Sequence, residues 1–387
     1  MLSSLAIFNY RSIRDMVIRP RQLNIVTGAN GSGKSNLYRA LRLLAEIAQG
    51  HAISSLAREG GIESTLWAGP EVFSRSVLRG DQPVQGTVKR GPISLRLGFT
   101  GDEFSYAIDL GLPAPSDSQF AHDPEIKREC IWNGGVFRPA ALLVDRRGSV
   151  VRTRSEDGQW NTITQNLAAF DSMMSHCADP RSTPEILLLR EQMRRWRFYD
   201  QLRTDPEAPA RLPQVGTHTP VLSNDGADLA AAIQTIREIG DVDALDSAVE
   251  DAFPGASVTV TNTGGRFELE MEQNGLLRPL TAAELSDGTL RYMLWVAALL
   301  TPRPPGLLVL NEPETSLHTD LLPALGRLVA HAARNSQVLV VSHAATLISA
   351  LRDEPDCNSI TLDKTLGETK VLGTDKLGGP SWSWPPR

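Results

Sequence analysis

Cysteine is scarce in this sequence, and long apolar runs are missing. The 387 residues include three cysteines, Cys130, Cys177 and Cys357, which lie far apart and form no CxxC pair. This excludes a disulfide framework and a cysteine-based zinc site, and it fits a reducing compartment. The longest purely apolar run, residues 293–300, is far shorter than the roughly 20 residues that span a bilayer. The first residues lack the apolar core of a signal peptide, so we expect a cytoplasmic protein without a membrane segment.

Positive charge is not in excess either. The formal net charge is -6, so no global basic field attracts nucleic acid or an anionic membrane. The net charge does not exclude a local basic patch. Hydrophobic residues make up 41% and charged residues 22% of the chain, which is ordinary for a globular protein. The length leaves room for about two or three domain-sized units.

The sequence does contain a glycine-rich stretch, GANGSGKS, which begins at residue 28. It follows a short aliphatic run and precedes apolar residues at helical spacing, so a strand, a loop and a helix succeed one another. The backbone N–H groups of such a loop and of the following helix N-terminus bind phosphate. We expect Lys34 to reach the β- and γ-phosphates and the Ser35 hydroxyl to ligate Mg²⁺. The residues expected to contact nucleotide are Gly28, Asn30, Gly31, Ser32, Gly33, Lys34, Ser35 and Asn36.

A second motif, LLVLNEPETSLH, covers residues 307–318. Its aliphatic strand is expected to bring acidic residues to the sheet edge beside the phosphate loop. Glu312 would act there as a general base or orient the attacking water, a role worth roughly 10²–10⁴ in rate. The alternative is a surface carboxylate that merely follows a strand. Asn311 precedes Glu312 and, unlike an aspartate, could bond only a metal-bound water and would bring no charge to a Mg²⁺ shell.

Two shorter motifs accompany these. LSDGTLRYM, residues 285–293, precedes a helical segment, and VVSHA, residues 340–344, ends an aliphatic strand. Alone, the first is common turn and capping chemistry, and a histidine at a strand end is more often structural. The presence of the other motifs favours a role for His343 at the γ-phosphate or the attacking water.

The order of these motifs resembles that of ATP-binding-cassette-type ATPases, specifically the RecF/SMC-like branch often labelled AAA ATPases. The resemblance rests on FNYRSIRD, GANGSGKSN, LSDGTLR, LNEPETSLH and VVSHA, and it covers about residues 1–50 and 280–350. It implies a homodimer that closes head to tail on two ATP molecules with Mg²⁺. Ser286 and Gly288 would then contact the γ-phosphate bound by the other subunit, and Arg11 would lie where related heads contact nucleotide.

The resemblance has two further implications. Residues 316–318 would contact the partner subunit. Asn311, as the departure from the family pattern, would make hydrolysis slow, so that ATP acts mainly as a dimerising ligand.

The fold class expected from these motifs is α/β: a P-loop NTPase of the ABC/SMC-head type, with a mixed sheet flanked by helices and an inserted lobe. Residues 1–50 and 280–373 would form the split head, and residues 374–387 an extended tail. Residues 51–279 would form the insertion, β-rich at 51–160, helical at 161–255 and a hairpin at 256–279.

Individual elements follow from periodicity. Alternating apolar residues predict hairpins at 93–110, around 145–148 and around the turn Gly264-Gly265. Helical spacing predicts a helix at 184–202 and another after a cap at Asp225. Short aliphatic runs at 306–311 and 337–342 predict parallel strands.

Three functions compete at this stage. The first is a RecF- or SMC-like head in DNA repair or in defence against phage and other mobile elements. The second is the ATPase subunit of a membrane transporter. The third is an ATP-dependent regulatory or scaffolding switch that acts on a protein partner without DNA. The long insertion between Ser35 and Ser286 argues against the transporter, and the lack of heptads predicts a compact lobe instead of a coiled coil.

The best local feature for DNA is LLREQMRRWRFYDQLR, in which arginines interleave with aromatic residues. Arginine can contact DNA phosphates while the aromatic side chains stack or pack. The alternative is an amphipathic helix whose arginines are solvated or paired with Glu191 and Asp200. The residues concerned are Arg190, Arg194, Arg195, Arg197, Arg203, Trp196, Phe198 and Tyr199.

A nuclease domain is not expected within this sequence. Related OLD-family proteins carry one after the ATPase, but the stretch that follows His343 looks too short for it. We read Asp353, Glu354, Asp356 and Asp363 as surface charge, and expect any nuclease or effector activity to come from a separate partner protein.

Overall fold

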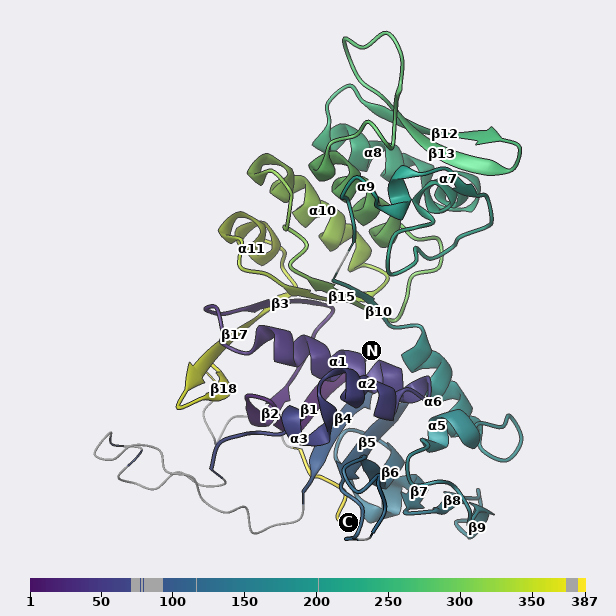
Figure 1. Ribbon diagram of the computed structural model, residues 1–387, viewed down its shortest axis with the longest axis vertical. Helices are drawn as coiled ribbons and strands as arrows, with labels where there is room; N and C mark the ends of the chain where they lie inside the picture. The colour runs from purple at the N-terminus through teal and green to yellow at the C-terminus, as the bar shows by residue number, and fades with distance from the viewer. Residues whose placement is uncertain (71–76, 78, 80–92, 116, 201, 374–381) are drawn as a thin grey trace. The chain divides into compact units, whose positions relative to one another are not determined.

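The computed structural model describes residues 1–387 except 71–76, 78, 80–92, 116, 201 and 374–381. Contacts divide the chain into two units, whose elements are labelled in Figure 1. Unit 1 consists of Met1–Pro20, Gly28–Arg195 and Ile360–Arg387, and unit 2 of Arg21–Thr27 and Trp196–Ser359. The phosphate loop therefore belongs to unit 1, and the strand before it belongs to unit 2.

Unit 1 is built on an antiparallel sheet whose eight described strands run in the order β2-β1-β4-β5-β6-β7-β8-β9. Alternating burial explains these strands: in β4, Leu95, Leu97 and Phe99 are all buried. The hairpins expected at 93–110 and around 145–148 are confirmed. The strands are β1 (Leu2–Tyr10), β2 (Ile13–Ile18), β4 (Leu95–Gly101), β5 (Phe104–Gly111), β6 (Glu125–Asn133), β7 (Leu142–Arg147), β8 (Val150–Arg154) and β9 (Trp160–Thr164).

The helices of unit 1 include the one that follows the phosphate loop. Its predicted apolar face, Leu37, Leu41, Leu44 and Ala48, is buried. Among the described residues of the segment 51–160, which was expected to be β-rich, two short helices are present. The described helices are α1 (Lys34–Ala48), α2 (Ala52–Arg58), α3 (Gly61–Thr65), α5 (Met173–His176) and α6 (Pro184–Arg194).

Unit 2 contains parallel strands in the order β10-β15-β16-β3. The strands expected at 306–311 and 337–342 are confirmed, and their aliphatic side chains are buried, which is typical of parallel sheets. The next strand, β17, begins in unit 2 and pairs in unit 1 with β18. Bounds are β3 (Leu23–Thr27), β10 (Arg197–Tyr199), β15 (Leu307–Asn311), β16 (Gln337–Val341), β17 (Cys357–Thr365) and β18 (Glu368–Val371).

Helices pack on these parallel strands to form the core of unit 2. Helix α9 is apolar on nearly every side, and its Trp295 is buried with Leu310 of β15 and Leu325 of α10. The hairpin expected at Gly264-Gly265 is confirmed as β12 and β13. The remaining elements are α7 (Leu229–Ile239), α8 (Val242–Ala252), α9 (Asp287–Leu299), α10 (Leu322–Ala332), α11 (Ala345–Arg352), β11 (Gln214–Val215), β12 (Ser257–Thr263), β13 (Arg266–Glu272) and β14 (Leu280–Thr281).

Two local predictions were wrong. The helix expected over 184–202 ends at Arg194, and residues 197–199 form β10 because they pair with β15 in the buried parallel sheet. The N-cap of α7 is Asp228, not Asp225. Asp225 instead stabilises the preceding turn, where its carboxylate accepts hydrogen bonds from the Ser223 hydroxyl and from a backbone N–H.

Candidate functional site

The phosphate loop in unit 1 has the backbone conformation that only glycine tolerates well. Gly28, Gly31 and Gly33 have φ angles of 152°, 79° and 106°. A Cβ at Gly28 would lie 2.4 Å from the carbonyl oxygen of Leu362, and one at Gly33 would lie 2.1 Å from Oγ1 of Thr369. The close approach of neighbouring groups therefore requires glycine at both positions, in addition to the φ angles.

Lys34 begins α1 and is buried within the loop. Its Nζ donates to the carbonyl oxygens of Gly28 at 2.7 Å and Ala29 at 3.2 Å, so the ammonium group already lies inside the turn. The hydroxyl oxygen of Ser32 is buried and has no hydrogen-bond partner among the residues described. A buried ammonium and an unsatisfied hydroxyl inside a ring of loop backbone fit a bound anion such as a nucleotide phosphate.

Two residues that the sequence reasoning missed hold this loop. The Thr369 hydroxyl donates to the Ser32 carbonyl at 2.8 Å and lies 2.7 Å from the Ser12 hydroxyl. The Asn36 amide in turn donates to the Ser12 hydroxyl at 2.7 Å. The chain Asn36–Ser12–Thr369–Ser32 thus links helix α1 to the loop. No sequence signal marks Thr369, whereas Ser12 is part of FNYRS.

Arg11 pairs with Glu59 in this structure. Its Nε and Nη2 atoms donate to Oε2 of Glu59 at 3.1 and 2.8 Å, and the Tyr10 hydroxyl donates to the same carboxylate. Burial, together with the Glu59 charge, raises the pKa of Tyr10, so this hydroxyl stays protonated as a donor. To contact a nucleotide, Arg11 would have to break its ion pair with Glu59 or bind the carboxylate and the nucleotide at the same time.

In unit 2, three neighbouring parallel strands end in the same register. Val26 of β3 pairs with Val341 of β16, which pairs with Asn311 of β15. His343, which follows β16, and Glu312, which follows β15, therefore leave the sheet of unit 2 at one edge, and β3 ends at that edge in the same register. This edge is where ligands bind in parallel α/β sheets.

Glu312 and His343 lie close together at this edge. Glu312 has φ 50°, the left-handed region, and its backbone N–H donates to the Val341 carbonyl at 2.8 Å. Its Oε1 lies 3.9 Å from Nδ1 of His343, and both side chains are about half exposed. A left-handed non-glycine residue costs free energy, and such strain is typical of functional positions.

Glu314, which the sequence reasoning did not select, connects these two strand ends. Its side chain is 8% exposed. Oε1 accepts from the Ser342 hydroxyl at 2.7 Å and from the backbone N–H groups of His343 and Ala344 at 2.9 and 3.2 Å. The same oxygen lies 3.4 Å from Nδ1 of His343. Glu314 therefore fixes the turn after β16 through its hydrogen bonds, and its carboxylate lies beside the His343 ring.

The metal ion expected here is tested by the unsatisfied acceptors. Within the described part of the chain, Oδ1 of Asn311 and Oε2 of Glu314 are buried without a hydrogen-bond donor. Buried acceptors of this kind need a donor, and metal-bound water is one. Asn311 would thus accept a hydrogen bond from a water bound to Mg²⁺. That the Ser35 hydroxyl is the direct Mg²⁺ ligand stays a prediction from the sequence. The metal would supply positive charge at the β- and γ-phosphate oxygens.

The LSDGT motif forms the N-terminus of α9. Ser286 is the N-cap, and its Oγ accepts from the backbone N–H of Thr289 at 3.1 Å. A Cβ added to Gly288 would lie 3.2 Å from the carbonyl oxygen of Ser316, which itself has φ 64°. The motif and the stretch 316–318 are therefore adjacent, as surfaces of one interface would be. Burial lowers the pKa of the Arg291 guanidinium in the same helix.

Arg211 holds the segment before this motif, and it too was missed. Its side chain is 7% exposed and makes an ion pair with Asp287 at 2.6 Å. The remaining N–H groups donate to backbone carbonyls on two sides, those of Thr204, Asp205, Ala282, Ala283 and Leu285. A single guanidinium thereby fixes the approach of the chain to Ser286.

The arginine and aromatic cluster does not form a stacking surface. Trp196, Phe198 and Tyr199 are buried at 4%, 7% and 0% exposure, because they belong to the core beside and within β10. The three rings therefore pack in the core of unit 2 and are not exposed for stacking on bases, while contact of the arginines with DNA phosphates stays a prediction. Arg190 and Arg194 both lie within ion-pair distance of Glu191, which agrees with the alternative interpretation.

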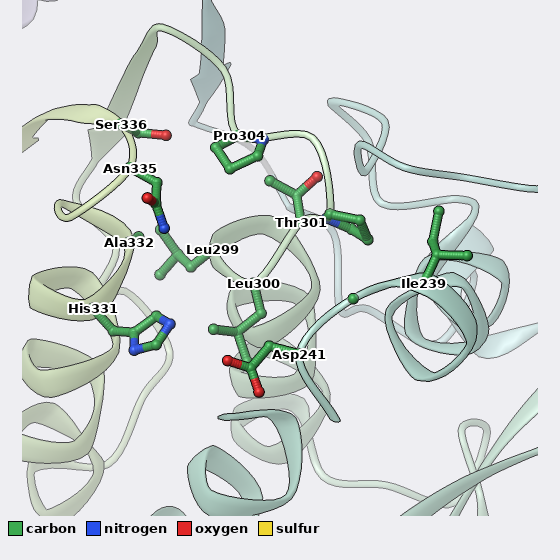
Figure 2. A pocket seen from close by; sticks show the side chains of 12 residues that line it. Ile239, Asp241, Leu299, Leu300, Thr301, Pro304, His331, Ala332, Asn335 and Ser336 are labelled. Atoms are coloured by element: carbon green, nitrogen blue, oxygen red, sulfur yellow. The ribbon is translucent and has the colours of Figure 1, made fainter. Parts of the chain in front are cut away.

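A separate pocket lies within unit 2, and Figure 2 shows the side chains that line it. It has a volume of about 200 Å³ and is lined from the ends of α7, α9 and α10. Ser336, which precedes β16, lies on its wall, as do Asp241 and His331. None of the motif residues lines this pocket, so it is not the expected nucleotide site.

Comparison with known proteins now adds family and fold. Residues 23–349 match the family model described as "AAA domain, putative AbiEii toxin, Type IV TA system". The chain belongs to this family. Because that match covers most of the chain, the expectation of an AAA-type ATPase in the ABC/SMC-like group is confirmed. None of the curated proteins compared with the chain matches it.

A solved structure shows the same fold. An Smc head crystallised with the C-winged helix domain of ScpA is 14% identical, with a TM-score of 0.52, over 96% of this chain and 97% of that one. The expected SMC-head α/β fold is therefore confirmed. An Smc head from Pyrococcus furiosus is 13% identical, with a TM-score of 0.49 over 96% and 95% of the two chains. Of the helices in the described residues, none is long and apolar enough to cross a membrane.

Proposed function

We propose that the chain binds ATP with Mg²⁺ and dimerises head to tail on it, with slow hydrolysis. The observation that carries this is the common edge of β3, β16 and β15. Glu312 and His343 follow two of these strands, and the phosphate loop follows the third in the chain. Glu312 would orient or deprotonate the attacking water, Lys34 would bind phosphate, and His343 would contact the γ-phosphate region.

The dimer is supported by the N-terminus of α9. This helix is 13 residues long, and Ser286 caps it at the surface with Gly288 in its first turn. A helix N-terminus with exposed N–H groups attracts an anion. In the proposed dimer this anion is the γ-phosphate bound by the other subunit. The neighbouring stretch 316–318 would extend the same contact.

Hydrolysis is proposed to be slow because Asn311 brings no charge to the metal shell. Its amide oxygen can accept a hydrogen bond from metal-bound water, but it cannot neutralise the cation as an aspartate does. ATP would then act mainly as the ligand that holds two copies together.

Downstream, the proposed dimer acts in DNA repair or in defence against phage, and the competing proposal is a switch on a protein partner. The family description, which names a type IV toxin–antitoxin system, supports a role in defence. The burial of Trp196 and Phe198 removes the best DNA-stacking feature and so favours the protein-partner version. A solved head of this fold is described as bound to another protein's winged-helix domain.

Light scattering tests the dimer directly. The mass of the wild-type protein should double with saturating Mg²⁺–ATP, and that of Lys34→Ala should not change. A wild-type protein that binds ATP but stays monomeric would refute the proposal. Repeating the measurement with duplex DNA separates the two downstream versions, since only the DNA-coupled version predicts retention of DNA by the ATP-bound dimer.

A further inference from the structure

Residues Trp382–Arg387 lie against the antiparallel sheet of unit 1, at the chain end marked C in Figure 1. The indole rings of Trp382 and Trp384 contact each other, with centroids 5.1 Å apart. The ring of Trp382 also contacts that of Trp132 in β6, with centroids 5.9 Å apart. Trp132 is fully buried and belongs to a small apolar cluster with Ala107, Cys130, Phe137 and Leu142. The segment therefore completes a core that the sheet alone would leave open.

The sheet is shaped to receive this segment. Gly98 lies inside β4, and a Cβ there would be 2.7 Å from the Trp382 ring. Gly111 ends β5, and a Cβ there would be 3.0 Å from Nη2 of Arg387. Glycine weakens a strand, and it is often found where a ligand or another segment approaches the backbone closely. Two such glycines coincide here with the two ends of the docked segment.

An ion pair fixes the direction of the segment. Asp109 of β5 is 5% exposed, and Arg387 donates to its two oxygens from Nε at 2.7 Å and Nη2 at 2.8 Å. Nη2 also donates to the Ile93 carbonyl at 2.8 Å. A bidentate pair of this geometry is stronger and more specific than a simple surface ion pair. The segment thus contacts the Trp132 ring, the glycine surface at Gly98 and the Asp109 carboxylate of the sheet.

The fit is specific but incomplete. Among the described residues, Nε1 of Trp132, Nε1 of Trp382 and Nη1 of Arg128 are buried donors with no acceptor. All three lie on or beside this face, and Arg128 lines the small cavity next to Trp384. A buried donor without a partner costs free energy, so these groups lower the net stability of docking. This favours a segment that can leave the face over one that is permanently part of the core.

We propose that this face of unit 1 is a peptide-recognition site for a Trp-Ser-Trp-Pro-Pro-Arg segment, and that a second copy of the chain can supply the segment in trans. Every contact described above is made by residues 382–387, so an identical segment from another molecule offers the same chemistry. Exchange of an identical element between protomers requires no new interface chemistry. The site is independent of the nucleotide motifs.

A peptide titration tests recognition on the full chain. The variant Trp382→Ala/Trp384→Ala/Arg387→Ala disables the resident segment and leaves the face intact. A fluorescein-labelled WSWPPR peptide should bind it saturably by anisotropy, and at least about tenfold more weakly when its arginine is alanine, a loss of about 1.4 kcal/mol or more. Wild-type protein should bind the peptide more weakly than the variant, because its own segment competes. Absence of saturable binding to a variant that melts like wild type would overturn the proposal.

A replacement variant and a mixing experiment complete the test. Should the triple variant lose its fold, Arg387→Ala alone takes its place, because it removes only the ion pair to Asp109. For the second copy, the tagged triple variant is mixed without nucleotide with an Asp109→Asn chain, whose segment is intact. We expect the mixture to form a complex that neither protein forms alone. Peptide binding without this complex would overturn the second copy as the source, and neither result depends on ATP.

Discussion

Nδ1 of His343 lies 3.4 Å from Oε1 of the buried Glu314 carboxylate. The same oxygen accepts from the backbone N–H of His343, so ring and backbone are held by one acceptor. Glu314 is in this sense a positioning residue for His343.

The variant Glu314→Gln tests this relationship. Its isosteric side chain can still accept from the two backbone N–H groups, so we expect the melting temperature to change little. The negative charge beside His343 is lost, and kcat for ATP hydrolysis should fall about tenfold, which corresponds to about 1.4 kcal/mol. His343→Ala should lower kcat to a similar or greater extent. An unchanged kcat in Glu314→Gln, with a reduced one in His343→Ala, would contradict a positioning role.

Glu312→Gln should separate nucleotide binding from hydrolysis. The amide cannot act as a base, so kcat should fall by roughly 10²–10⁴. If ATP holds the two copies together, the variant should accumulate as a dimer with ATP that persists during size-exclusion chromatography. Glu238→Gln is a suitable control, since this exposed carboxylate lies near His218 and Gln234 and not at the strand edge. An oligomer size that ATP does not alter would count against the prediction.

Asn311→Asp should accelerate hydrolysis and make stability depend on the metal. Oδ1 of Asn311 is already buried without a donor in the described chain. A carboxylate at that place is therefore costly without a cation and favourable beside one. We expect the variant to melt below wild type in EDTA, to recover with Mg²⁺–ATP, and to turn over about tenfold faster. A wild-type rate of tens per second would by itself disprove slow hydrolysis.

The sequence identified the phosphate loop and the strands around it because their signals are local. GANGSGKS needs glycine at Gly28 and Gly33 for its own backbone path, and the strand that ends at Asn311 is aliphatic throughout. The β10 strand was missed because Arg197–Tyr199 is only three residues long and continues a helical pattern. Nothing within that short stretch reveals that β15 provides its hydrogen bonds.

The roles of Glu314 and Arg211 could not be read from the chain for a related reason. Glu314 acts on the end of a strand that is adjacent only in the folded sheet. Arg211 bonds to Asp287, 76 positions away in the chain, and one arginine in a proline-rich segment carries no motif. Both residues support a motif without belonging to one. Their identification required the register of β15 and β16 and the path of the chain before α9.

Arg211→Lys tests whether Arg211 positions the LSDGT motif for dimerisation. Lysine keeps the positive charge, but its single ammonium group cannot span Thr204, Leu285 and Asp287 at once. If Ser286 must be held for an ATP molecule on the other subunit, ATP-driven dimerisation should weaken about tenfold. The affinity of the monomer for a fluorescent ATP analogue should stay unchanged, because the phosphate loop is untouched.

The matched control for this variant is Arg237→Lys. Arg237 also bonds an aspartate and a backbone carbonyl in unit 2, at Asp246 and Val258, away from the motif. Both substitutions should lower the melting temperature, Arg211→Lys by more, because Arg211 donates to five backbone carbonyls and Arg237 to one. Only Arg211→Lys should shift the concentration of protein at which ATP produces dimers. If both variants dimerise equally well, Arg211 stabilises the fold but does not position Ser286. If the wild-type protein itself fails to dimerise with ATP, the proposed function is refuted.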